Sequence, residues 1–132
     1  MTTLQTRVPE GTQRLAVVAC VVDIAMFVVF AALGRASHDE GHAVTGTLRV
    51  AAPFVIAYVV MALVARLHRD PLSVRRAAAV WFPTIVLGMV LRRLVFDRGT
   101  APAFVVVAFI TTAVLLLGWR ALVHIIRTAR AA

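Results

Sequence analysis

Four long apolar stretches run along the chain, separated by short segments rich in arginine, glycine and proline. The first stretch, from Leu15 to Leu33, has nineteen residues, and Asp23 near its centre is its one acidic residue. A helix of about 20 residues crosses the roughly 30 Å hydrocarbon core of a bilayer. This stretch therefore predicts a transmembrane helix at about 15–33, and the same pattern predicts further spans at about 47–67, 77–96 and 100–119.

The segments outside these spans are short. Residues 1–14 are polar and predict an N-terminal tail, and residues 127–132 predict a basic C-terminal tail. Between them, residues 15–126 predict one transmembrane domain. Its third stretch has only fifteen uncharged residues, from Ala77 to Leu91, and it reaches a full span when arginines at both ends extend toward the interface. The predicted fold class is all-α: an integral membrane bundle of four transmembrane helices.

Composition supports a membrane protein and indicates its orientation. Hydrophobic residues make up 61% of the chain and the mean hydropathy is +0.92, whereas soluble domains are about 45–50% apolar. Four spans place both termini and the 66–76 loop on one side. That side carries nine arginines (7, 14, 66, 69, 75, 76, 120, 127, 130) and the other carries five (35, 49, 92, 93, 98). The positive-inside rule then places both termini in the cytoplasm, for a multi-pass protein of the cell (cytoplasmic) membrane.

The formal net charge of +8 does not indicate nucleic-acid binding. No basic patch with interleaved aromatic residues lies outside the apolar spans. The arginines are better explained as flanking anchors that meet anionic lipid, so the expected partner is the lipid bilayer.

Asp23 is the main candidate for a functional group, because an ionisable side chain in a membrane is costly and usually faces the bundle interior. Counting 1.5 Å per residue along antiparallel helices places Tyr58, Thr84, Thr111 and Thr112 near its depth. These side chains predict a polar layer. Two interpretations of the layer remain open: a structural clasp that fixes helix register, or a proton or substrate site.

Arg92 is the nearest plausible cation for Asp23 in this arrangement. It shares a helix face with Trp81, Thr84 and Gly88, which predicts that it points inward. Yet it lies about seven residues, or roughly 10 Å, nearer the outer surface, so a direct pair is at the limit of reach. Because desolvation disfavours the charged form, Asp23 is expected to be protonated part of the time.

The longest loop, residues 34–49, contains a second candidate site, formed by Arg35, Ser37 and His38. His38 and His42 have a spacing that suits a divalent metal, but no cysteine or remote acid completes a ligand set, so no metal is expected. Cys20, the single cysteine, is expected to be a packing residue. No nucleotide-binding, nucleophile-elbow, zinc-protease or haem motif is present, so the sequence indicates neither an enzyme nor a cofactor.

The residues around these positions resemble a bacterial family of small four-span membrane proteins, domain of unknown function 3054. The resemblance extends from Asp23 over nearly the whole chain, and its motifs are Asp23 with Phe30 and Gly34-Arg35-Ala36-Ser37-His38; Trp81-Phe82-Pro83-Thr84 with Gly88-Met89 and Arg92-Arg93; Gly99-Thr100-Ala101 with Phe104 and Val107-Ala108; and Gly118-Trp119-Arg120. The resemblance implies a four-span membrane protein, and this family has no assigned activity.

Two functions from different classes fit these observations. The first is a structural or accessory helical bundle that self-associates or joins a larger membrane complex. The second is a proton-coupled small-solute transporter or channel that uses Asp23. A similarity of layout to small multidrug resistance transporters, which have four spans and a carboxylate in the first, favours the second. The aromatic positions of those transporters do not obviously match, and the arginine asymmetry argues against dual insertion.

Overall fold

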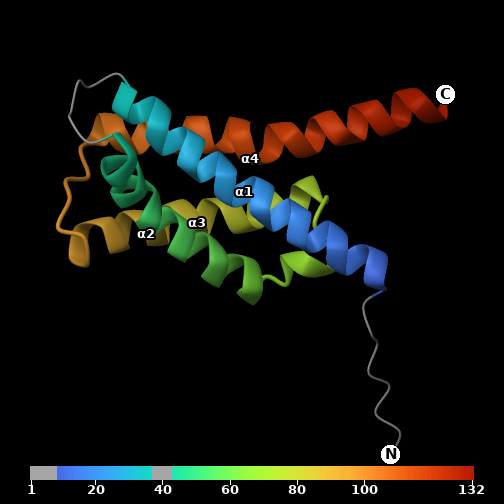
Figure 1. The fold of residues 1–132 in the computed structure, drawn as a ribbon, viewed down its shortest axis with the longest axis horizontal. Coiled ribbons are helices and arrows are strands. Elements are labelled where there is room, and N and C mark those ends of the chain that lie inside the picture. Colours follow the sequence, from blue (N-terminus) through green and yellow to red (C-terminus); the bar gives the residue numbers. More distant parts are fainter. Residues whose placement is uncertain (1–8, 37–42) are drawn as a thin grey trace, which may run out of the picture.

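Four long helices that alternate in direction make up the fold (Figure 1). A computed structural model of the protein describes residues 9–36 and 43–132. All four helices are long and apolar enough to cross a membrane, which confirms the predicted all-α, four-span architecture. Their bounds are α1 Glu10–Ala36, α2 Ala43–Val64, α3 Val74–Leu94 and α4 Pro102–Ala131, with a short 3-10 helix, η1, at Leu67–Arg69.

The first and last helices are longer than the spans predicted from hydropathy. α1 begins at Glu10, just after Pro9, whose carbonyl oxygen accepts hydrogen bonds from the amides of Thr12 and Gln13. α4 continues to Ala131, through most of the segment predicted as a C-terminal tail. At 1.5 Å per residue, α4 is about 45 Å long, so it extends well past a hydrocarbon core of roughly 30 Å.

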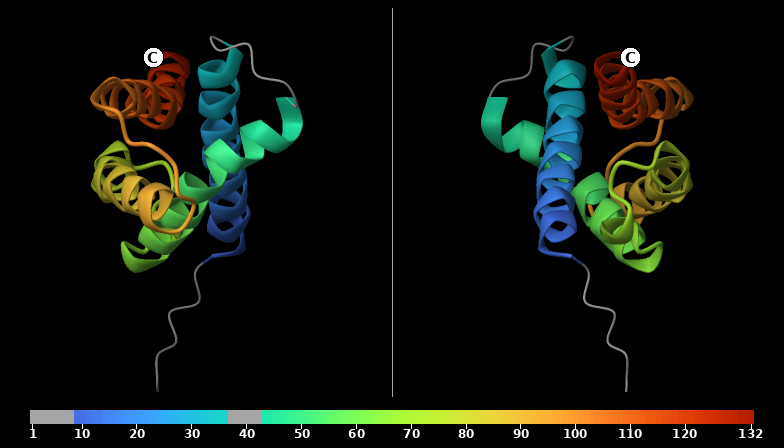
Figure 2. Two further views of the ribbon diagram at one scale, coloured as in Figure 1. Left: turned by 90° about the vertical axis from the view of Figure 1, so that its left-hand side faces the viewer. Right: turned by 90° about the vertical axis from the view of Figure 1, so that its right-hand side faces the viewer.

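The start of α1, the α2–α3 connection and the end of α4 lie at the same end of the bundle (Figure 1). The α3–α4 connection and the end of α1 lie at the opposite end. The placement of the first end in the cytoplasm remains a prediction from the arginine count. α1 crosses α4 obliquely rather than running beside it along its whole length, as the two end views make clear (Figure 2).

The α2–α3 connection brings a backbone carbonyl close to α4. Arg66, in a left-handed conformation with φ of 53°, ends the last turn after α2, and η1 follows. Ser73 then caps α3 by accepting a hydrogen bond from the amide of Arg76 at 3.2 Å. Pro71 and Leu72, between η1 and this cap, are buried, and their carbonyl oxygens contact side chains of α4.

Aromatic side chains fill the core between α1, α2 and α4. Phe54 of α2 stacks on Phe27 of α1 with ring centroids 6.4 Å apart, and it meets Phe30 edge-on at 5.7 Å. Phe104 of α4 closes the cluster against both Phe30 and Phe54. Gly88 of α3 lies directly against the Phe54 ring, where a Cβ would come within 2.5 Å of a ring carbon. This glycine therefore sets how closely α3 approaches α2.

The outward faces of the helices remain apolar. On α1, the face opposite Asp23 exposes Val17, Val18 and Val21, each more than half exposed. Exposed valines and leucines occur on the other three helices as well. In water such surfaces would associate, whereas in a bilayer they face lipid, so this distribution matches a membrane-spanning bundle.

Candidate functional site

The carboxylate of Asp23 is the centre of the polar network in the bundle. The side chain is fully buried, and its two oxygens accept four hydrogen bonds from three residues. Oδ1 accepts from Arg120 and Trp119, and Oδ2 accepts from Arg120 and Tyr58. A carboxylate offers about four lone-pair sites, so all of its acceptor capacity is used within the protein.

Arg120 of α4 supplies the counter-charge. Its Nη1 lies 2.8 Å from Oδ1 and its Nη2 lies 2.6 Å from Oδ2, which is the bidentate geometry in which guanidinium and carboxylate interact most strongly. Its Nε donates to the carbonyl oxygen of Pro71 at 2.9 Å, and Nη1 also donates to that of Leu116 at 3.0 Å. Arg120 is itself fully buried. Its hydrogen bonds link α1, α4 and the α2–α3 connection.

Tyr58 and Trp119 complete the network. The Tyr58 hydroxyl donates to Oδ2 of Asp23 at 2.5 Å, and the Trp119 indole nitrogen donates to Oδ1 at 2.9 Å. The guanidinium carbon of Arg120 also lies 4.5 Å from the centroid of the Trp119 ring, in a cation–π contact. We call Asp23, Tyr58, Trp119 and Arg120 the Asp23 clasp.

The Asp23 clasp gives the carboxylate a cation as a direct partner. Its two oxygens accept hydrogen bonds from Arg120, Trp119 and Tyr58. The expectation that Asp23 is protonated part of the time starts from desolvation with no cation beside the carboxylate, whereas Arg120 lies beside it in a bidentate pair. That expectation stays a prediction.

Arg92, the cation that the depth count places nearest to Asp23, does not contact it. Arg92 lies at the far end of the bundle, where its Nε donates to the carbonyl oxygen of Gly99 at 2.9 Å. Its guanidinium carbon lies 4.2 Å from the centroid of the Phe104 ring. The depth estimate ended the fourth span at Trp119 and treated Arg120 as an interfacial anchor. Asp23 instead meets α4 at Arg120, about two turns beyond Thr112, on a helix that continues to Ala131.

The threonines of the predicted polar layer lie apart from Asp23. Thr112 accepts a hydrogen bond from the Trp81 indole at 3.0 Å and donates to the carbonyl oxygen of Ala108, one turn earlier. Thr111 is only half-buried. Thr84 is fully buried, and its hydroxyl has no hydrogen-bond partner within the part of the chain that the structure describes. Of the predicted layer, the structure brings only Tyr58 to Asp23.

The predicted outer-loop site is described only in part. Ser37 and His38 lie outside the described residues. Arg35, near the end of α1, lines a cavity of about 460 Å³ together with Arg92 and Arg98. Two of the predicted site residues, Arg35 and Arg92, therefore border the same cavity although they were assigned to different sites.

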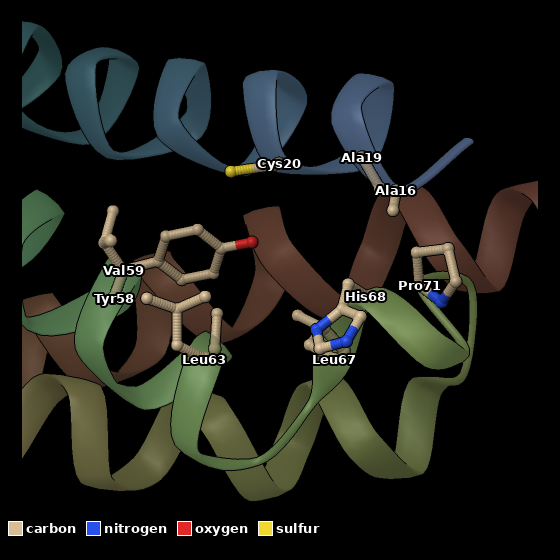
Figure 3. A pocket seen from close by; sticks show the side chains of 10 residues that line it. Ala16, Ala19, Cys20, Tyr58, Val59, Leu63, Leu67, His68 and Pro71 are labelled. Carbon is tan, nitrogen blue, oxygen red and sulfur yellow. The ribbon is translucent and has the colours of Figure 1, made fainter. Parts of the chain in front are cut away.

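A second cavity lies beside the Asp23 clasp, between α1 and the end of α2 (Figure 3). It encloses about 110 Å³, and its lining includes Cys20, Tyr58 and His68. Tyr58 reaches from α2 toward α1 across one part of it, and His68 and Pro71 border another part. Asp23 does not line this cavity, because the Tyr58 ring and the surrounding helices cover it.

Sequence reasoning missed Arg120 and Trp119. The available signal was the helix face: Thr112, Leu116 and Arg120 recur every fourth residue, and all three are buried. An arginine that continues a buried face is placed to point inward rather than into the interface. The charge of Arg120 led instead to its assignment as the end of the span.

Comparison with known proteins identifies a family. Residues 20–123 match the family model described as "Protein of unknown function (DUF3054)". The match covers most of the chain and includes all four members of the Asp23 clasp. No curated protein and no solved structure matches the chain.

Proposed function

We propose that this chain, which belongs to the DUF3054 family of proteins of unknown function, is a structural or accessory helical bundle. In this proposal it lies in the bacterial cytoplasmic membrane with both termini inside the cell, and it self-associates or joins a larger membrane complex. It has no enzymatic activity and binds no cofactor. The observation that supports this role is the complete occupancy of Asp23 by donors of the protein itself.

A carboxylate that couples proton movement to transport must exchange its partners during the cycle. Asp23 would have to give up a bidentate pair with Arg120 and leave a buried guanidinium without its counter-charge. Separating such a pair in a buried setting costs several kcal/mol, about 3–5 kcal/mol when one partner is removed. A structural role requires no such step, because the clasp joins α1, α2 and α4 as it stands.

A transporter remains the second candidate function, and one observation favours it. The cavity beside Tyr58 places an accessible volume next to a residue that donates directly to Asp23. In that alternative, a rotation of Tyr58 would open one lone pair of Oδ2 to the cavity. Asp23 would then carry a proton, with Tyr58 controlling its access.

Two measurements on the same purified protein separate these functions. The first is proton-linked solute flux in proteoliposomes, compared among wild type, Asp23→Asn and Tyr58→Phe. Thr111→Val is a matched control, because Thr111 is half-buried and lies outside the Asp23 clasp. The second is the mass of the protein and any bound partner after extraction in mild detergent.

The structural role predicts no proton-linked flux in any variant and a stoichiometric self-associated or hetero-oligomeric complex. The transporter predicts flux that is abolished in a folded Asp23→Asn variant and retained in Thr111→Val. Flux of this kind would overturn the proposed structural role.

A further inference from the structure

Three arginines border the larger cavity at the end of the bundle opposite the Asp23 clasp. Arg35 comes from the end of α1, Arg92 from the last turn of α3, and Arg98 from the α3–α4 connection. Among the residues that the structure describes, every charged side chain that lines this cavity is an arginine. Asp97, beside Arg98 in the chain, is exposed and does not line the cavity.

The local fold holds Arg98 close to Arg92 despite their equal charges. Asp97 adopts a left-handed conformation with φ of 46°, which reverses the chain after α3. The amide of Arg98 then donates to the carbonyl oxygen of Arg92 at 2.9 Å. Both arginines line the cavity. Neither has an ion-pair partner in the described part of the chain, so this arrangement leaves a concentration of positive charge at the cavity.

One donor of Arg92 has no partner in the described part of the chain. Its Nε donates to Gly99 and its guanidinium plane lies over Phe104, which together fix the orientation of the group. Its Nη1 is buried and has no hydrogen-bond partner among the described residues. A buried charged donor without an acceptor is costly, so a ligand that supplies an acceptor would stabilise this geometry.

The first turn of α4 adds a further source of positive potential. Ala101, Ala103 and Phe104 line the same cavity, and Ala101 at the N-cap makes no capping hydrogen bond through its side chain. Pro102, the first residue of α4, has no N–H, so the amides of Ala103 and Phe104 are the ones that lack an intrahelical acceptor and favour an anion here. The remaining lining is apolar and includes Phe30, Val50 and Val107.

We propose that the cavity bordered by Arg35, Arg92 and Arg98 binds the phosphate group of an anionic ligand. Guanidinium groups match the geometry of phosphate through paired hydrogen bonds, and those of Arg92 and Arg98 beside a helix N-terminus suit a charged oxyanion. The volume of about 460 Å³ accommodates a phosphate together with an adjoining apolar group. The phosphate belongs either to a membrane lipid or to a free solute. This site does not depend on the function proposed for the Asp23 clasp.

Two binding measurements on the full chain in dodecyl maltoside distinguish a lipid phosphate from a free phosphate. Native mass spectrometry compares retention of dioleoylphosphatidylglycerol with that of dioleoylglycerol, which lacks the phosphate. Thermal unfolding compares sodium phosphate with sodium chloride at equal ionic strength. Both are repeated for Arg98→Gln and Arg92→Gln, with Arg75→Gln as a control that removes an exposed arginine at the other end of α3.

Preferential retention of the phospholipid supports a lipid phosphate, and stabilisation by inorganic phosphate supports a free one. In either case Arg98→Gln weakens binding by about tenfold, the loss of one charge-assisted contact, and Arg75→Gln does not. Arg98→Gln is the decisive variant, because the Arg98 side chain makes no hydrogen bond or ion pair with the described residues, whereas Arg92→Gln also loses contacts to Gly99 and Phe104. Binding of neither probe, or equal binding by wild type and Arg98→Gln, would overturn the proposal.

Discussion

Arg120 near the end of the fourth span pairs with Asp23 in the first, with both guanidinium terminal nitrogens within 2.8 Å of the two carboxylate oxygens. The two residues are 97 positions apart in the chain. Their contact therefore closes the bundle between its first and last helices. Since both side chains are fully buried, neither charge can be satisfied by water when the other is removed.

Replacing Arg120 by lysine tests the role of the guanidinium shape. Lysine keeps the positive charge but cannot donate to both oxygens of Asp23 and also to Pro71 and Leu116 in the present geometry. We expect Arg120→Lys to lower the free energy of unfolding by about 1.5–3 kcal/mol, the scale of a charged hydrogen bond. The measurement is unfolding in mixed micelles. Wild-type stability in this variant would show that charge alone is sufficient.

Tyr58→Phe removes one donor from Asp23 and retains the aromatic ring that packs against Phe27. We expect a loss of about 1.5–3 kcal/mol, because the lost hydrogen bond is to a charged acceptor. Thermal unfolding in detergent measures the loss, and Thr111→Val provides a control outside the network. If Tyr58→Phe and Thr111→Val have the same small effect, then the Tyr58 hydroxyl does not hold the Asp23 clasp.

Gly88→Ala tests the close approach of α3 to α2. The added methyl group would come within 2.5 Å of a carbon of the Phe54 ring, so the helices must separate or the ring must move. Overpacking of this kind costs about 1–3 kcal/mol. Gly118→Ala is the matched control: a Cβ at this exposed helical position meets nothing within 4 Å, so it should be neutral or gain up to about 1 kcal/mol.

A second substitution at the same contact strengthens this test. Phe54→Leu combined with Gly88→Ala leaves room for the new methyl group and should recover part of the loss. Stability is measured by thermal unfolding for both single variants and the pair. Equal melting temperatures for Gly88→Ala and Gly118→Ala would contradict the close packing at Gly88.

Thr84→Val separates a packing role from a ligand role at a position that the sequence analysis placed in the polar layer. The Thr84 hydroxyl is buried without a partner among the described residues, and valine has nearly the same shape. Removing an unsatisfied buried polar group should leave stability unchanged or raise it by about 1–3 kcal/mol. Unfolding in detergent measures the change. A marked destabilisation would show that the hydroxyl makes an interaction that packing does not explain.

The four-span architecture and the inward position of Asp23 were predictable because both depend on local properties of the chain. Span length follows from hydropathy, and a single acid in an apolar helix is costly wherever its neighbours lie. Tyr58 was also found by depth, since α1 and α2 are neighbours in sequence and pack together along their length.

The partner of Asp23 was not predictable by counting residues along each span, because that count assumes that all helices run parallel to the membrane normal. α1 crosses α4 obliquely (Figure 2), and Asp23 contacts α4 at Arg120, about two turns beyond Thr112. How the helices pack depends on contacts between residues distant in the chain, such as Phe30 with Phe104 and Gly88 with Phe54. Hydropathy also assigned Arg120 to the surface, although its helix face is buried.

A double-mutant cycle between Asp23 and Arg120 tests the central claim most directly, namely that this pair locks α1 to α4. The measurement is the free energy of unfolding of wild type, Asp23→Asn, Arg120→Gln and the double variant in the same micelles. Each single variant should lose about 3–5 kcal/mol, because each leaves a buried group without its counterpart. The double variant should lose no more than either single variant, giving a large coupling energy. Additive losses, with a coupling energy near zero, would contradict the clasp.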